Sequence, residues 1–415
     1  MEASIWTEPM LTALEQGVKG GKWFALSDKL WNENNLFAAS VKVVSNAGGA
    51  GIDGQSVETH RRERSQQLET LARELREGTY RPHPSKRVWI PKPGRPEKRP
   101  LGIPTVRDRV VQTALRNVME PIFEREFAEH SYGFRPQRGC RDALRRVKEL
   151  LDRGYTHVVD GDIQGYFDTI DHEVLMRRMG ERIADGRIKQ LIEGYLKAGV
   201  LDTHKGWEPT ERGTPQGAVI SPLLANIYLN PLDHLMAAEG YEMVRYADDL
   251  VVLCRSREEA GRAMSKLAEW MRANGLKLHP EKTRVVDASQ RGGFDFLGYH
   301  FERGYCWPRQ KSLDKIKDAI RQQTRRANGK SMEMIVCVIN AKLRGWYGYF
   351  KHSHKTTFRE MDGWVRMRLR SILRKRSGRR GRGRGTDHQR WPNAYFGALG
   401  LFNLEAARAK ACQSR

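Results

Sequence analysis

The chain has 415 residues, 39% of them hydrophobic, which excludes an intrinsically disordered protein and allows two or three domains with their own cores. Its net charge of +23 predicts a polyanionic partner, nucleic acid before an anionic membrane. Five widely spaced cysteines exclude a disulfide framework and a zinc finger, and the chain has neither a signal-peptide pattern nor a ~20-residue apolar span, so a cytoplasmic protein is expected.

The positive charge is concentrated toward the C-terminus. Residues 311–415 contain 26 basic and 7 acidic residues and so carry +19 of the net charge. Residues 1–310 carry only +4. This asymmetry predicts a polyanion-binding C-terminal quarter attached to a nearly neutral body.

The N-terminal third combines helical and proline-rich segments. Residues 1–80 have amphipathic helical stretches around a glycine-rich loop at 46–54. Residues 80–105 are rich in proline and in cations, with the short β-prone pieces "RVWI" and "PLGI". Proline confines such pieces to edge strands or loops, so a basic flap is expected there. A helix is expected at about 107–127.

Two aspartate pairs lie at the ends of apolar strands. In "HVVDGDIQGYFDTIDH" a strand runs into Asp160 and Asp162, whose side chains share one side because strand side chains alternate. In "MVRYADDLVVLC" the apolar run is interrupted by Asp248 and Asp249, which predicts a hairpin with an acidic tip. Adjacent carboxylates repel each other, so a positive partner is expected at this tip.

The segment between the two aspartate pairs reads as a turn and a helix. It is "RGTPQGAVISPLLANIYLNPLDHLM", a glycine-rich turn followed by a long apolar helix whose prolines fit the first turns. After the acidic hairpin, a helix is expected at about 258–274, then further strands. The order of elements predicts an α+β sheet with helices on one face and its two acidic tips close together.

The C-terminal part is expected to be helical. Three segments after residue 312 have apolar residues at spacings of three and four, which indicates a small helix bundle. Residues 374–384 follow with seven cations and no acid in eleven residues, and are expected to be disordered until they meet a polyanion.

Nucleotidyl transfer requires carboxylates from two sides of a site. A pair of divalent ions ~3.5–4 Å apart activates a 3′-hydroxyl and stabilises the leaving pyrophosphate, and hard oxygen ligands favour Mg²⁺. Asp162, Asp248 and Asp249 are the candidate ligands for two such ions. The alternative reading, two solvated polar turns, requires both acidic tips and the glycine-rich turn to be coincidental.

These motifs together resemble a known family. "YADD" after "GTPQGAVISPLLANIYL", with "DGDIQGYFD" upstream and "FLGY" downstream, is similar to the palm of reverse transcriptases. "IPKPGRPEKRPLGIPTVRDRVVQ", "SYGFRPQRGCRDAL" and "LRGWYGYFK" narrow the resemblance to bacterial group II intron reverse transcriptases and maturases. It implies a right-hand polymerase of fingers, palm and thumb, with an antiparallel palm sheet and a helical thumb.

The resemblance also implies domain boundaries. Residues 1–80 would be an N-terminal extension and the start of the fingers, and residues 81–310 the fingers and palm. Residues 311–375 would be the helical thumb or maturase domain. Residues 376–415 would be a basic C-terminal tail, a reduced DNA-binding region.

Site residues follow from the same resemblance. Asp162, Asp248 and Asp249 would be the catalytic metal ligands, and Asp160 is set aside because Phe167 stands five residues after Asp162, at the family's spacing for its aromatic residue. The dNTP-binding residues would be Lys92, Arg99, Ile163, Phe167 and Gln216, with Phe167 excluding a 2′-hydroxyl or, alternatively, packing in the core. The template or RNA contacts would be Arg135, Gly213, Gly217, Arg366, Arg370, Arg374 and Lys375. Lys282 in "PEKT" would be near the site or simply a surface lysine.

The family implies RNA-directed DNA synthesis with Mg²⁺ and dNTPs on an RNA template and DNA primer. It also implies binding of intron RNA to assist splicing, and retrohoming into target DNA. No His-Asn-His or paired-cysteine pattern follows Lys375, so the resemblance is to family members that lack an endonuclease. Two alternatives stay open: a host-adapted reverse transcriptase for defence or repair, and an RNA-binding splicing factor with an inactive polymerase.

Overall fold

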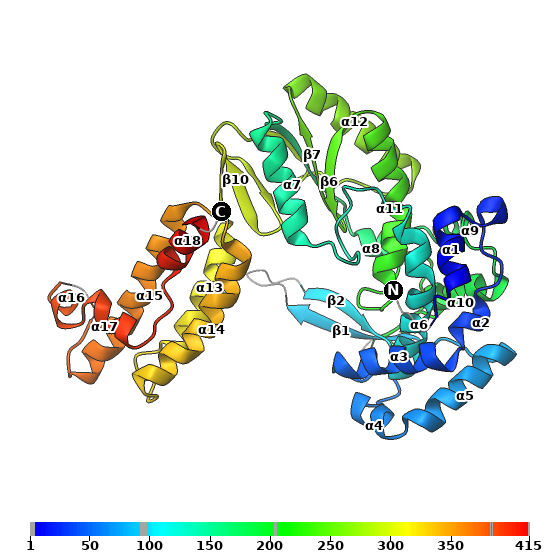
Figure 1. Ribbon diagram of the computed structural model, residues 1–415, viewed down its shortest axis with the longest axis horizontal. Coiled ribbons are helices and arrows are strands. Elements are labelled where there is room, and N and C mark those ends of the chain that lie inside the picture. Colours follow the sequence, from blue (N-terminus) through cyan, green and yellow to red (C-terminus); the bar gives the residue numbers. More distant parts are fainter. Residues whose placement is uncertain (1–4, 92–97, 203–205, 382, 384, 414–415) are drawn as a thin grey trace. The chain divides into compact units, whose positions relative to one another are not determined.

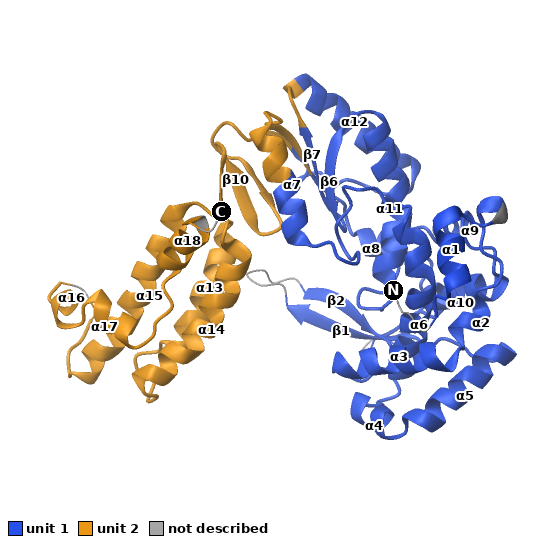
Figure 2. Cartoon of the chain, viewed as in Figure 1, with its two compact units in different colours: residues 1–146, 161–253, 258–284 blue, residues 147–160, 254–257, 285–415 orange. Residues whose placement is uncertain are grey.

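The computed structural model describes residues 5–91, 98–202, 206–381, 383 and 385–413, and Lys92, assigned above to the dNTP, lies outside them (Figure 1). The chain divides into two compact units (Figure 2). Unit 1 comprises residues 1–146, 161–253 and 258–284, and unit 2 comprises residues 147–160, 254–257 and 285–415. Among the described residues, no helix combines the length and the apolar character needed to cross a membrane.

The N-terminal part of unit 1 is a group of helices followed by a small sheet, here called the fingers sheet. The helices are α1 (Glu8–Gln16), the 3₁₀ turn η1 (Lys19–Gly21), α2 (Ser27–Leu30), α3 (Glu33–Ser45), α4 (Val57–Arg62) and α5 (Arg64–Glu77). The sheet has the order β2-β1-β4-β5, with β1 (Ser85–Pro91), β2 (Lys98–Ile103), β4 (Val200–Asp202) and β5 (Gly206–Glu208). The proline-rich segment therefore forms an antiparallel hairpin, with β2 as the edge strand that its prolines predict.

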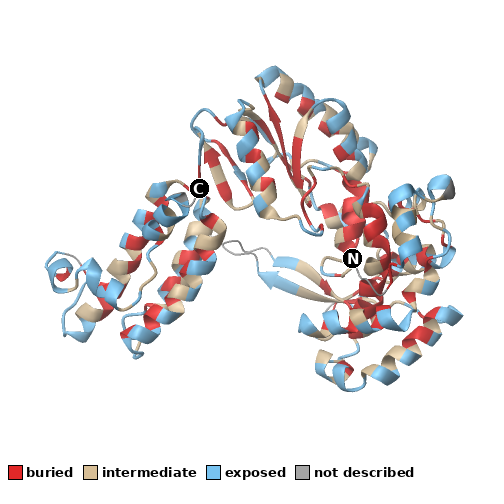
Figure 3. Ribbon diagram, in the orientation of Figure 1, coloured by how far each residue is buried: buried red, intermediate tan, exposed pale blue. Residues whose placement is uncertain are grey.

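A second four-stranded sheet carries the acidic tips and has the order β6-β7-β3-β8. Its strands are β3 (His157–Asp162), β6 (Glu242–Tyr246), β7 (Asp249–Cys254) and β8 (Arg284–Asp287). The helices that accompany these strands along the chain are α6 (Val106–Glu124), α7 (Cys140–Asp152), α8 (Tyr166–Thr169), α9 (His172–Gly180), α10 (Gly186–Lys197), α11 (Ser221–Ala238) and α12 (Arg257–Ala273). The core is densest in α6 and α11, which Figure 3 shows largely in red. The near-continuous apolar run of α11 matches a helix that is covered on most sides, whereas α6 also buries polar residues such as Asp108 and Gln112.

Unit 2 contains a small antiparallel sheet and the C-terminal helices. The sheet has the order β11-β10-β9, with β9 (Phe294–Phe296), β10 (Tyr299–Glu302) and β11 (Tyr305–Pro308). The long helices are α13 (Gln310–Gln323), α14 (Met332–Phe350) and α15 (Lys355–Arg376), as the apolar spacing predicts, and the short ones are α16 (Asp387–Arg390), α17 (Asn393–Ala398) and α18 (Leu404–Gln413).

The end of the chain differs from the expected basic tail. Asp362 of α15 accepts the backbone N–H groups of Leu404 and Glu405 at 3.1 and 3.0 Å, so it caps the start of α18. Asn340 of α14 donates to Gly400 O and accepts from Phe402 N. Residues 400–405 are therefore folded against α14 and α15, because side chains of the bundle satisfy their backbone groups.

The arginine-glycine stretch at 374–384 was expected to be disordered, and its described residues are instead folded. The helix α15 continues through Arg376, and the Arg374 guanidinium forms an ion pair of 2.6 Å with the fully buried Asp387. Gly383 N donates to Ser371 Oγ at 3.1 Å. The charge of this stretch does not reveal Asp387, a buried acid three residues beyond it that neutralises Arg374.

Candidate active site

The acidic hairpin is a tight turn between β6 and β7. Tyr246 pairs with Asp249 across the antiparallel ladder, which leaves Ala247 and Asp248 at the tip. Ala247 has a φ of +59°, a left-handed conformation that is rare for a residue with a side chain. The turn therefore needs support from its surroundings.

A buried arginine supplies this support. Arg245 is 1% exposed, and its Nη1 donates to the carbonyl oxygen of Ala247 at 2.9 Å. Its Nε donates to Asp233 Oδ1 of α11 at 2.7 Å, its Nη1 also bonds Asn226 Oδ1 at 3.1 Å, and its Nη2 bonds Ser131 Oγ at 2.7 Å. The guanidinium thus ties the strained turn to α11 and to the segment before α7. The sequence reading missed Arg245, although an arginine inside an otherwise apolar strand is a signal for a buried partner.

A glycine completes the packing beneath the turn. A Cβ at Gly133 would overlap the backbone nitrogen of Ala247, so only glycine allows this close approach. Asn226 Nδ2 donates to Gly133 O at 2.8 Å and holds the glycine in place. The "SYGF" motif therefore has a structural role under the acidic tip.

Asp162 lies at the end of β3 and has a cationic neighbour. His279 N donates to Asp162 O at 2.7 Å, and Gln164 N donates to Lys277 O at 2.8 Å, so the "LKLHPEKT" segment runs beside this end of β3. This pairing brings Lys282 Nζ to 2.5 Å from Asp162 Oδ2. Lys282 is therefore both an exposed lysine and a neighbour of Asp162.

The two acidic tips influence each other electrostatically. Burial raises the pKa of the Asp248 carboxyl, and the negative charge of Asp162 raises it further, while Arg99 and Arg245 oppose this shift. Asp162 is therefore a carboxylate whose charge acts on Asp248.

The surroundings of Asp162 and Asp248 favour a cation. Asp162 attracts a cationic side chain at 2.5 Å, and Asp248 is a carboxylate whose charged form is disfavoured by a neighbouring negative charge that a cation would offset. Among the described residues, no group of three or more His, Cys, Asp and Glu side chains is arranged closely enough to hold a metal ion by itself. Asp249 begins β7 directly beside Asp248 and is half-buried.

The glycine-rich turn at 213–217 bonds to the edge strand β2 of the fingers sheet. Gly213 and Gly217 have φ values of +84° and +110°, and a Cβ at Gly217 would lie 2.6 Å from the carbonyl oxygen of Gly102 in β2. Gly102 N donates to Gln216 O at 2.7 Å, and Thr214 N donates to Phe167 O at 2.7 Å. The turn therefore connects α8 to the outer edge of β2 through backbone contacts, and Phe167 itself is half-buried.

Several predicted contact residues are internal instead. Ile163 is 3% exposed and forms a β-bridge with Leu278, so its side chain faces the core. Arg135 is buried and bonds Glu124 together with the carbonyls of Ala128 and Ser131. These bonds occupy the side chain that was expected to contact the template.

The expected RNA-contact residues of α15 separate into two groups. Arg370 is buried and bonds Trp391 O and Asn393 Oδ1, and Arg374 pairs with Asp387. Both are therefore structural. Arg366 is half-buried and Lys375 is exposed, so these two side chains are accessible on the helix surface.

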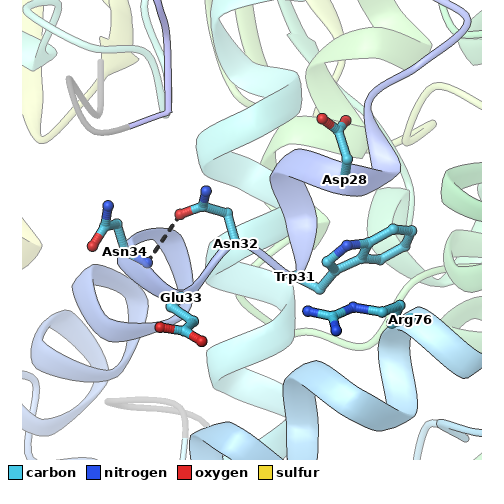
Figure 4. Close-up of a pocket in the computed structure, with 6 residues that line it drawn as sticks. All are labelled: Asp28, Trp31, Asn32, Glu33, Asn34 and Arg76. Carbon is cyan, nitrogen blue, oxygen red and sulfur yellow. Dashed lines mark hydrogen bonds between the residues drawn. The ribbon is translucent and has the colours of Figure 1, made fainter.

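A polar pocket of about 380 Å³ lies away from the carboxylates, where α2, α3 and α5 meet (Figure 4). It is lined by Asp28, Trp31, Asn32, Glu33, Asn34 and Arg76. Asn32 Oδ1 accepts from Asn34 N at 2.9 Å, so part of this polar lining serves to cap α3. None of the residues that line this pocket belongs to the acidic tips.

Comparison with known families gives two matches. Residues 90–301 match the family "Reverse transcriptase (RNA-dependent DNA polymerase)". Residues 313–391 match "Group II intron, maturase-specific domain". The first match includes all three candidate metal ligands, and the second includes α14 and α15.

Two curated bacterial proteins are similar in sequence. Protein YkfC of Escherichia coli (strain K12) is 33% identical over 317 residues, which are 66% of this chain and 82% of YkfC. Group II intron-encoded protein LtrA of Lactococcus lactis subsp. cremoris is 44% identical over 168 residues, which are 40% of this chain and 28% of LtrA.

Solved structures align more loosely. A chain of a partial Cas6-RT-Cas1–Cas2 complex is 22% identical, with a TM-score of 0.38, over 60% of this chain and 41% of that one. Telomerase from Candida albicans is 12% identical, with a TM-score of 0.45, over 73% of this chain and 62% of that one.

Proposed function

The chain belongs to the family of group II intron reverse transcriptases with a maturase domain, and on this premise we propose that it copies intron RNA into DNA during retrohoming and binds intron RNA to promote splicing. The observation that carries the proposal is that Asp162 ends β3 and Asp248 lies in the β6–β7 turn of the same sheet, both inside the reverse transcriptase match. The proposed domains are fingers and palm at 81–310, thumb at 311–375 and, in place of a free tail, the packed helices that follow.

Asp162, Asp248 and Asp249 would hold two Mg²⁺ ions. When bound, such ions lower the pKa of a 3′-hydroxyl and neutralise charge on the leaving pyrophosphate. Arg99 is exposed and near enough to affect the pKa of Asp248, so it is suited to hold the triphosphate beside the carboxylates. Gln216 and its flanking glycines would keep β2 at a fixed distance from the palm.

The proposal is tested with the full chain in two assays. We expect primer extension on an RNA template with Mg²⁺ and dNTPs, and accelerated splicing of the intron RNA that flanks the coding sequence. Extension without splicing assistance would favour a host-adapted enzyme for defence or repair. Splicing assistance without extension would instead indicate a splicing factor with an inactive polymerase.

Phe167→Ala is expected to admit ribonucleotides. The proposed reason is that the half-buried ring fills the space that a 2′-hydroxyl requires, and removing such a steric block is typically worth about 10- to 100-fold in discrimination. The measurement is the ratio of dNTP to rNTP incorporation in single-nucleotide extension. Phe24→Ala, which removes an aromatic side chain that is 68% exposed, is the control and should leave the ratio unchanged. An unchanged ratio for Phe167→Ala would assign the ring to packing alone.

A further inference from the structure

Tyr166 stands directly before Phe167 on the short helix α8 and is buried, with 2% of its surface exposed. Its hydroxyl donates to the carbonyl oxygen of Ala225 in α11 at 2.6 Å. Burial raises the pKa of Tyr166 well above its ordinary value, so the hydroxyl stays protonated and acts as a donor. One hydrogen bond therefore ties the residue before Phe167 to the second turn of α11.

The ring of Tyr166 also contacts the ring of Phe167. The two ring centroids lie 5.5 Å apart with an interplanar angle of 60°, which is an edge-to-face contact. Tyr166 makes a second contact of this kind with Tyr228 of α11, at 6.5 Å and 64°. Aromatic pairs favour such edge-to-face arrangements. The half-buried Phe167 ring is therefore packed against a ring that is itself held to α11.

The backbone of Phe167 is tied to the same helix by another route. Thr214 N donates to Phe167 O at 2.7 Å, and Thr214 Oγ1 is hydrogen-bonded to Ser221 Oγ at 2.5 Å. Ser221 is the first residue of α11, and both Thr214 and Ser221 are buried. The glycine-rich turn thus holds the main chain of Phe167, whereas Tyr166 holds its ring.

The same part of α11 supports the acidic hairpin. Asn226, which follows the acceptor of the Tyr166 bond, accepts from Arg245 Nη1 at 3.1 Å. This Arg245 nitrogen also donates to the carbonyl oxygen of Ala247 at 2.9 Å. Neighbouring residues of an α-helix keep a fixed separation. The bond of Tyr166 therefore fixes the Phe167 ring relative to the turn that carries the catalytic carboxylates.

We propose that Tyr166 is a positioning residue for sugar selection. Its hydrogen bond to Ala225 holds the Phe167 ring where that ring excludes the 2′-hydroxyl of an incoming nucleotide. A ring excludes a hydroxyl only while it cannot move aside, and functional side chains must be held within ~0.5 Å of their working position. The half-buried Phe167 ring has one side free to move, so its neighbour supplies the restraint. This inference rests on the proposed role of Phe167 in reverse transcription.

Tyr166→Phe removes the hydroxyl and keeps the ring, so it tests the hydrogen bond alone. In single-nucleotide extension by the full chain with Mg²⁺, the ratio of dNTP to rNTP incorporation is expected to fall about fivefold. This is the factor that corresponds to a net hydrogen-bond contribution of ~1 kcal/mol. The change should appear in kcat/KM for rNTPs, while kcat for dNTPs should stay within about twofold of the wild-type value.

Tyr228→Phe is the matched control. Tyr228 is also fully buried, and its hydroxyl donates to the carbonyl oxygen of Asn274 at 2.6 Å. The two variants lose the same kind of bond, so both should lower Tm by a similar amount, but only Tyr166→Phe should change the ratio. An unchanged ratio for Tyr166→Phe, or an equal change for Tyr228→Phe, would overturn the positioning role.

The double variant Tyr166→Phe/Phe167→Ala shows whether Tyr166 acts through the Phe167 ring. Once the ring is absent, loss of the hydroxyl should not change the ratio beyond the effect of Phe167→Ala, because residues that act together are not additive. Additive effects would contradict the inference. An unchanged ratio for Phe167→Ala would reject the proposed role of Phe167 as well. A changed ratio for Phe167→Ala with an unchanged one for Tyr166→Phe would reject the positioning role alone.

Discussion

Asp248→Asn is expected to abolish RNA-templated primer extension, with a loss of at least about 1,000-fold. The amide keeps the shape of the side chain but is a poor ligand for Mg²⁺, and the metal contributes several kcal/mol to the transfer step, where ~1.4 kcal/mol corresponds to a factor of ten. RNA affinity should stay within about twofold, because the cationic surface is unchanged. Asp160→Asn, on the same strand as Asp162, is the matched control and should remain active. Clear extension by purified Asp248→Asn would remove this residue from the site.

Asp248→Asn is expected to stabilise the fold although it abolishes activity. Burial and the charge of Asp162 raise the pKa of Asp248 in the folded state, so its ionised form opposes folding above that pKa. Without added metal, Asp248→Asn should therefore raise Tm at neutral pH. The gain should shrink as pH falls through the raised pKa and vanish below the ordinary value of 3.8, where the carboxyl is neutral in both states. Thermal unfolding between pH 3 and 8 measures this dependence.

Arg245→Met is expected to lower the free energy of unfolding by about 3–5 kcal/mol, because it leaves the buried Asp233 without its partner. It also removes the bond to the Ala247 carbonyl, so extension should be lost. The double variant Arg245→Met/Asp233→Leu removes both charges and should recover most of the stability, as urea unfolding would show. It should stay inactive, because the strained turn at Ala247 is still unsupported. A double variant with wild-type extension would show that the ion pair serves folding alone.

The helices and strands around the site follow from local patterns. Alternation before Asp162 and the break at Asp248 place both strand ends, and the glycine-rich turn predicts the start of α11. These features depend on neighbours a few residues apart. The reverse transcriptase match agrees with the polymerase fold that the motifs imply.

The contacts of the arginines could not be predicted from such local patterns. Arg135, Arg370 and Arg374 look like RNA contacts in the sequence, but each is neutralised or bonded within the fold. The partner of strand residue Arg245 is 12 residues away on helix α11, and that of Lys282 is 120 residues away. Sequence reports how many charges a segment carries, whereas burial decides which of them face solvent.

The chain's basic end illustrates the same difficulty. Its composition resembles a disordered segment, yet Phe396 and Leu404 are almost fully buried. Two polar side chains of the bundle form hydrogen bonds with the backbone of this segment: Asn340 bonds Gly400, and Asp362 bonds Leu404. Few apolar residues suffice when the bundle itself provides hydrogen-bond partners.

The bond between Gly102 N and Gln216 O also bears on aggregation through the edge of the fingers sheet. A sheet edge with unpaired backbone groups is a template for strands of other molecules and promotes aggregation. Here the glycine-rich turn lies against the outer side of β2, and the opposite edge strand, β5, is only three residues long. The fingers sheet can therefore expose Ile90 and Trp207 to solvent while its β2 edge is partly shielded from backbone pairing with a second copy.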